Sequence, residues 1–212
     1  MATRVYLEVG KRRVFASAAD WPGWTRAGKD EQSALEALAT AAPRYTPVAK
    51  AARIPFAPSA GLDVVERLPG DATTDFGAPG AIAKAESKRL TKKEAGRLSA
   101  LVAASWTVFD RVVETAPPSL RKGPRGGGRD RDEIVEHVLG AEIMYARKLG
   151  LRLIQPGAGD SAAVRGHRNA IVAGLRAGTK GITEGGWPAR YVARRMAWHV
   201  LDHAWEIEDR AP

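Results

Sequence analysis

Two histidines near the C-terminal end of the chain constrain its fold more than any other feature. His199 and His203 lie four residues apart in residues 197–210, a run that contains neither Gly nor Pro. On an α-helix this spacing stacks two imidazoles one turn apart on one face, close enough to hold one metal ion. Val192 and Met196 fall on the same side, so we expect both imidazoles to face a protein core rather than solvent.

His137 is the candidate third ligand, because it borders the apolar stripe of another segment with helical periodicity. Three imidazoles that leave one position open are typical of a catalytic zinc-like centre. The competing interpretation is a set of core histidines that bond only to their neighbours. His167 flanks the stripe of a third helical segment, and we expect it at the surface or behind the ligands.

Four helical segments make up the C-terminal part of the chain. A Thr91–Glu94 capping box opens the first, and Asp130 with Glu133 opens the second. The third covers about residues 161–177, and the fourth begins at Pro188 and continues to about residue 208. Amphipathic helices of this length, joined by loops, predict a four-helix bundle.

The first 68 residues have a different pattern. Residues 4–9 and 13–18 alternate apolar and polar side chains around a Gly10 turn, which predicts a hairpin, and a short third strand follows. A helix over about residues 31–42 and a strand over 62–68 complete a β-β-β-α-β order. The predicted fold class is therefore α+β: a module over residues 1–68, a linker over 69–87 rich in Gly and Pro, and a bundle over 88–212.

The N-terminal module resembles the HicB-type antitoxin fold. The resemblance is carried by Tyr6-Leu7-Glu8-Val9, Phe15-Ala16-Ser17-Ala18, Trp21-Pro22-Gly23-Trp24 and residues 28–35, GKDEQSAL. It covers about 65 residues through short motifs. The resemblance implies either a protein-binding module or a general α/β platform.

The C-terminal part resembles the DinB/YfiT superfamily. The residues are Asp132-Glu133-Ile134-Val135-Glu136-His137 on the second helix and His199-Val200-Leu201-Asp202-His203 on the last. The resemblance implies an up-down-down-up bundle that binds a divalent metal, with zinc or nickel favoured, through His137, His199 and His203. It further implies a metal-dependent S-transferase, isomerase or hydrolase that acts on a small-molecule substrate, in some members with a thiol such as mycothiol.

Other side chains have expected roles around this centre. Glu206 and Asp202 are both placed to orient an imidazole, and Glu206 can also accept a proton. The alternative is that both carboxylates make ordinary surface pairs with arginines. Arg168 falls on the core stripe of its helix, where it either pairs with a carboxylate such as Glu142 or holds an anionic substrate group.

The Gly-rich loop between the first two helices contains Arg121, Arg125 and Arg129. It ends at a helix N-terminus, a position that favours anions. Two interpretations stay open: a lid that recruits a carboxylate- or phosphate-bearing molecule, and a solvated connection.

The last helix also carries Trp198, Leu201 and Trp205 on the side opposite its histidines. A face of this kind is expected to be covered. We expect it to pack either on the N-terminal module or on a second copy of the chain, as a homodimer through Trp198 and Trp205.

The composition and net charge of the chain limit the remaining classes of function. The absence of cysteine excludes disulfides and a cysteine nucleophile, and no stretch approaches the roughly 20 apolar residues of a membrane span, so a cytoplasmic protein without a membrane partner is expected. The net charge of +9 is spread widely, which favours a solvated basic surface over a nucleic-acid partner. The alternative function is a non-enzymatic interaction protein that binds a protein or nucleic acid through its HicB-like module or basic loop.

Overall fold

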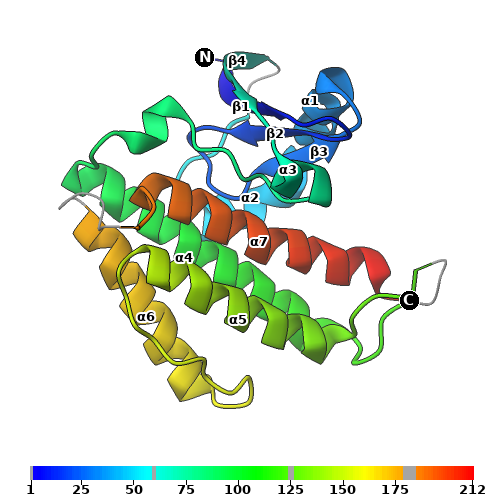
Figure 1. The fold of residues 1–212 in the computed structure, drawn as a ribbon. Helices are drawn as coiled ribbons and strands as arrows, with labels where there is room; N and C mark the ends of the chain where they lie inside the picture. The colour runs from blue at the N-terminus through cyan, green and yellow to red at the C-terminus, as the bar shows by residue number, and fades with distance from the viewer. Residues whose placement is uncertain (1, 59–60, 124–126, 179–184) are drawn as a thin grey trace.

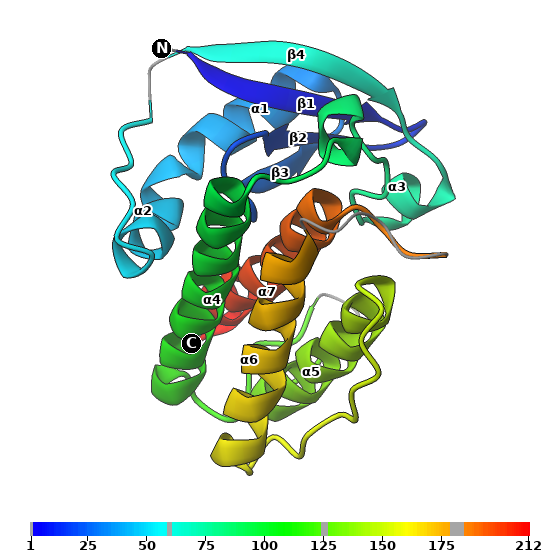
Figure 2. The same ribbon diagram turned by 90° about the vertical axis from the view of Figure 1, so that its left-hand side faces the viewer.

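The structure, a computed structural model, describes residues 2–58, 61–123, 127–178 and 185–212. It is an α+β fold, as predicted, in which a small mixed sheet lies across one end of a group of long helices (Figures 1 and 2). None of the helices in these residues is long and apolar enough to cross a membrane.

The N-terminal part forms a four-stranded sheet in the order β3-β2-β1-β4. The strands are β1 (Thr3–Val9), β2 (Val14–Ala18), β3 (Thr25–Gly28) and β4 (Leu62–Pro69). β1 pairs antiparallel with β2, with Tyr6 opposite Ser17, and parallel with β4 on its other side. The predicted hairpin and the predicted strand over residues 62–68 are thus confirmed.

Both faces of this sheet are covered, which explains why every residue of β2 is buried. Val5 and Leu7 belong to the main core, together with Ala34 and Leu38 of α1 (Glu31–Thr40). Tyr6 points to the opposite face and packs with Ala83 in a smaller cluster.

A second helix, α2 (Ala42–Ala51), occupies a stretch in which the prolines predict only a connection. The first of these prolines lies in the opening turn, where a missing N–H costs nothing, whereas Pro47 lies inside the helix. Tyr45 and Val48 are fully buried, and the Tyr45 hydroxyl donates to the Pro22 carbonyl at 2.8 Å. Tertiary packing therefore offsets the backbone bond that Pro47 cannot make.

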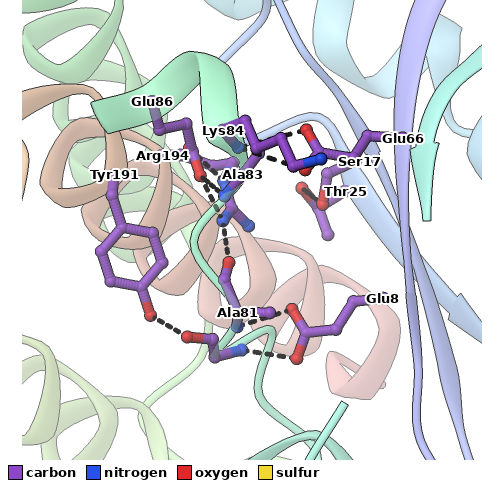
Figure 3. Close-up of polar contacts among 11 residues, drawn as sticks. Glu8, Ser17, Thr25, Glu66, Ala81, Ala83, Lys84, Glu86, Tyr191 and Arg194 are labelled. Atoms are coloured by element: carbon purple, nitrogen blue, oxygen red, sulfur yellow. Dashed lines mark hydrogen bonds and ion pairs between the residues drawn. The ribbon is translucent and has the colours of Figure 1, made fainter. Parts of the chain in front are cut away.

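The segment between the sheet and the long helices is packed rather than free. It contains α3 (Ala72–Phe76) and the 3-10 helix η1 (Lys84–Ser87). The buried Glu8 carboxylate accepts hydrogen bonds from the backbone N–H groups of Gly80 and Ala81, at 2.8 and 2.9 Å (Figure 3). These bonds tie the segment to the face of β1 that carries Tyr6 and Glu8.

Four long helices form the rest of the described chain: α4 (Lys92–Thr115), α5 (Arg131–Lys148), α6 (Ser161–Ala177) and α7 (Ala189–Arg210). The capping box of Thr91 with Glu94 is present, and the Glu133 carboxylate accepts from the Asp130 N–H, as predicted. α7 packs against both α4 and α5, and α6 packs against α4. Their shared core includes Val102, Phe109, Ile134, Val138, Ile171, Leu175, Met196 and Val200.

An ion pair inside the protein holds α7 to the segment before α4. Arg194 is buried and its Nε and Nη2 donate to the two Glu86 oxygens at 2.6 and 3.0 Å (Figure 3). Arg194 Nη2 also donates to the Ala81 carbonyl at 2.7 Å, and the Tyr191 hydroxyl donates to Gly80 at 2.6 Å. α7 is thereby fixed to the sheet side of the molecule along its first turns.

Candidate metal centre

α7 places His199 and His203 one turn apart, as the four-residue spacing predicts. The centroids of the two rings lie 4.6 Å apart, and both side chains are only partly buried. The helix is held in place by residues that flank the histidines, such as Met196 and Val200, which are buried in the core. The two imidazoles therefore occupy a fixed face that points toward α5.

α5 supplies the third imidazole. His137 Nε2 lies 3.2 Å from His199 Nε2, and the His137 ring centroid is 4.9 Å from that of His203. One ligand atom from each of the three histidines lies within 4.8 Å of the others. The three residues that the sequence singles out as ligands are thus brought together by two helices.

Burial keeps at least two of these imidazoles in the form that binds metal. It lowers the pKa of His137, and the neighbouring charges of His203 and Arg129 lower this pKa further. Burial is also the largest cause that holds the pKa of His199 well below its ordinary value. Neutral imidazole nitrogens are the species that coordinate divalent ions, so this environment favours coordination over protonation.

Glu206 contacts the cluster from the next turn of α7, as predicted. Its Oε2 lies 2.7 Å from His203 Nδ1, and its Oε1 accepts from Arg210 Nη1 at 2.5 Å. A carboxylate that accepts a hydrogen bond from Nδ1–H keeps the imidazole proton on Nδ1 and leaves the Nε2 lone pair for a metal. The hydrogen bond with His203 is the main cause that lowers the pKa of Glu206.

The separation of two of the three imidazoles is compatible with a tetrahedral ion, and the third has a nitrogen within 4.8 Å of both. Two imidazole nitrogens bound tetrahedrally at the usual metal–nitrogen distance lie about 3.3 Å apart. The 3.2 Å separation of His137 Nε2 and His199 Nε2 matches this spacing. Zinc and nickel both accept imidazole ligands, and the donor set alone does not distinguish them.

Asp202 makes a different contact from Glu206. Its Oδ1 lies 3.4 Å from Arg26 Nη1, on the N-terminal module. Of the two carboxylates that the sequence offers for orienting an imidazole, the hydrogen bonds thus select Glu206.

Arg168 lies in a second polar group, built from α4, α5 and α6. Its Nη1 donates to both Asp110 oxygens at 2.8 Å, and its Nε lies 3.5 Å from Glu142 Oε1. Within the described residues its hydrogen bonds and ion pairs involve none of the three histidines of the cluster. The expected pairing with a carboxylate is present, while a role at the reaction centre stays a prediction.

His167 is buried in the same group, rather than at the surface. Its Nε2 lies 3.2 Å from Glu142 Oε2, and both side chains are almost fully buried. The prediction of a surface position for His167 is wrong. His167 lies at the edge of the apolar stripe of α6, but α5 places the buried Glu142 carboxylate opposite that edge.

The loop arginines lie beside the C-terminal end of α7. Arg121 Nη2 donates to the Asp209 carbonyl at 2.5 Å, and the Arg129 carbonyl accepts from Arg210 Nη2 at 2.8 Å. Arg129 is close enough to lower the pKa of both His137 and His199. Arg125, the third arginine of the predicted lid, lies outside the described residues, and the recruitment of a carboxylate- or phosphate-bearing cofactor by this loop stays a prediction.

The tryptophan face of α7 is covered by the N-terminal module, the first of the two expected arrangements. The Phe15 and Trp198 rings meet edge to face at 6.0 Å, and Arg26 and Arg44 lie over the Trp205 ring at 5.2 and 5.3 Å. A homodimer through Trp198 and Trp205 stays a prediction, and it would require this module to move away.

One residue that the sequence did not single out lies next to the cluster. Arg195 precedes His199 by four residues, so it belongs to the same face of α7. It is 8% exposed, and its guanidinium lies over the Tyr145 and Trp198 rings. The spacing to His199 could have found it, but one arginine among many in a basic chain carries little signal by itself.

No family model, curated protein or solved structure matches this chain.

Proposed function

We propose that this chain is a metal-dependent enzyme of the DinB/YfiT type, with its divalent ion held by His137, His199 and His203. The observation that carries the proposal is the convergence of three imidazoles from α5 and α7, with ligand atoms within 4.8 Å of one another. Zinc and nickel are the favoured ions. A bound ion would supply a Lewis acid that lowers the pKa of a coordinated thiol or water toward neutrality.

The arrangement of the long helices supports the same assignment. We propose that α4, α5, α6 and α7 form an up-down-down-up four-helix bundle, in which the ligands come from the second and last helices. α7 lies against both α4 and α5, which is compatible with this order (Figure 2). We further propose that the HicB-like module acts as a platform, since it is packed on α7 through Phe15 and Trp198.

The chain's own residues have distinct tasks in this proposal. Glu206 holds His203 in the tautomer that presents Nε2, and Arg210 in turn holds the Glu206 carboxylate. Glu206 also lies close enough to the cluster to receive a proton from a thiol or water there. The reaction class is S-transfer, isomerisation or hydrolysis of a small electrophilic substrate, with a low-molecular-weight thiol such as mycothiol as cosubstrate in the first two.

A reconstitution experiment tests this proposal. The protein is stripped with a chelator, reloaded with zinc or nickel, and screened with small thiols and water against soluble electrophiles. We expect turnover only after reloading, loss of turnover in His137→Ala and His203→Ala, and retention in His167→Gln, which changes the histidine outside the cluster. Turnover that is independent of metal and of the three histidines would overturn the proposal, as would the absence of turnover across the whole screen.

A further inference from the structure

Arg194 and Arg195 are neighbours on α7 and have opposite environments. Arg194 is buried and fully paired with Glu86 and the Ala81 carbonyl. Arg195 is also buried, with 8% of its surface exposed, but its Nε and Nη1 are completely buried and no described residue accepts a hydrogen bond from either. A buried guanidinium without an acceptor is costly, and a bound anion would satisfy it.

Two aromatic rings lie beside the Arg195 guanidinium, and no carboxylate of the described residues forms an ion pair with it. The guanidinium carbon lies 5.0 Å from the Trp198 ring centroid and 5.9 Å from that of Tyr145. These contacts hold the planar group from its faces and leave the Nε and Nη1 donors at its edge without a hydrogen-bond acceptor among the described residues.

The same two rings border the histidine cluster. The centroids of Tyr145 and Trp198 lie 6.0 and 6.1 Å from that of His199. Arg195 is also one of the charges that lower the pKa of His199, which places the guanidinium within electrostatic range of the cluster. Arg195, His199 and His203 therefore follow one another along one face of α7.

We propose that Arg195 is the binding site for the carboxylate of a small ligand whose other end reaches the three-histidine cluster. The ligand class is a carboxylic acid that carries a thiol or another metal-binding group a few carbon atoms away. A planar carboxylate matches the donors of a guanidinium, and a buried setting strengthens this pairing. Arg195 is thus a specificity residue that selects acids over neutral molecules of the same shape.

This inference rests on the proposed function, because it requires an ion at the three histidines. The test uses the full chain loaded with cobalt, whose absorption spectrum reports directly on thiols that bind the ion. The probes are mercapto-acids with two to five carbon atoms and the corresponding neutral amides, which differ from the acids by one charge and hardly in size. The measured quantity is the ratio of the dissociation constants of amide and acid, obtained from spectral titrations.

We expect at least one acid in the series to bind about 10- to 100-fold more tightly than its amide, since a hydrogen bond to a charged group has this effect on affinity. Arg195→Gln should reduce the ratio to about one, and Arg195→Lys, which keeps the charge but loses the planar donors, should give an intermediate ratio. Arg190→Gln is the matched control, because it removes a charge from the same helix at a residue paired with Glu94. Its ratio should equal that of the unchanged protein.

The outcomes separate the two proposals. If cobalt does not bind, the proposed function fails and this inference falls with it. If cobalt binds but no acid is preferred over its amide, or the preference survives in Arg195→Gln, only the role of Arg195 is overturned. If the variants do not fold, the absence of any preference for the acid over its amide in the unchanged protein still overturns the role of Arg195.

Discussion

His137 Nε2 lies 3.2 Å from His199 Nε2, although 62 residues separate them in sequence. Neither residue can bring the other into place locally, so the contact depends on how α5 packs against α7. Ile134 and Val138 flank His137 along α5, and Met196 and Val200 flank His199 along α7, and all four belong to the shared core. The core therefore fixes the spacing of the imidazoles before any ion binds, which reduces the cost of organising the ligands on binding.

Glu206→Gln tests whether the carboxylate tunes the metal centre. The amide keeps nearly the same shape but loses the charge that stabilises the His203 Nδ1–H tautomer and pairs with Arg210. We expect zinc affinity to fall about 10- to 100-fold, the range typical when an outer carboxylate is removed from a histidine ligand. Competition with a chromophoric chelator measures this affinity.

Glu208→Gln is the control for this substitution. Glu208 lies two residues further along α7 and pairs with Arg44 instead of a histidine. The zinc affinity of the Glu208→Gln variant should equal that of the unchanged protein. Equal losses in both variants would mean that general charge, and not the contact with His203, accounts for the effect.

Arg194→Met tests the ion pair that joins α7 to η1. The substitution leaves the Glu86 carboxylate buried without its bidentate partner. We expect the free energy of unfolding in urea to fall by about 3 to 5 kcal/mol. Arg67→Met, which breaks an exposed pair with Glu31, should cost much less. Similar losses in the two variants would contradict the structural importance given to Arg194.

Gly23→Ala tests the docking of the N-terminal module on α7. Gly23 has φ of +93°, and an added Cβ would lie 2.6 Å from Leu201 Cδ1 and 3.1 Å from the Ala197 carbonyl oxygen. Strain and overpacking should together lower the free energy of unfolding by about 2 to 4 kcal/mol. Gly96→Ala is the matched control, because nothing lies within 4 Å of its added Cβ in α4, and it should stabilise by up to about 1 kcal/mol. A neutral Gly23→Ala would show that the module does not approach α7 this closely.

Glu94 should give stability a dependence on acidic pH. Hydrogen bonds from Thr91, and then the contact with Arg190, lower the pKa of Glu94 from 4.5 to about 2. Because the folded pKa is depressed, the contribution is complete above pH 4.5 and is lost as the pH falls toward 2. Glu94 is largely solvated, so Glu94→Gln should cost only about 0.5 kcal/mol at pH 7, and this difference should shrink in urea titrations at pH 4 and pH 3. A difference that stays constant with pH would exclude the charge as its source.

Much of the secondary structure follows from local patterns in the sequence. The alternation in β1 and β2, the capping boxes at Thr91 and Asp130, and the apolar stripe of α6 each predict an element that the structure contains. α2 was missed because two prolines mask a helix that tertiary burial of Tyr45 stabilises. Local sequence patterns reflect the backbone preferences of neighbouring residues. They do not show that Tyr45 is buried by residues far away in the sequence.

The candidate site also contains features that local sequence predicts and features that depend on the packed fold. The spacing of His199 and His203 predicts their adjacency, because helix geometry fixes it. The choice between Glu206 and Asp202 depends on side-chain direction relative to the N-terminal module, and only the packed structure supplies this. The importance of Arg195 depends on the absence of an acceptor among the described residues around it, a property of the whole fold and not of its neighbours in sequence.

The most direct test of the central claim is the number of metal ions bound per chain. Equilibrium dialysis of the purified protein against zinc, followed by elemental analysis, should give one ion for each chain. His199→Ala should bind none at the same free zinc concentration, and His167→Gln, checked for folding by circular dichroism, should still bind one. A chain that binds no ion at any concentration, or a His199→Ala variant that binds as well as the unchanged protein, would contradict the three-histidine metal centre.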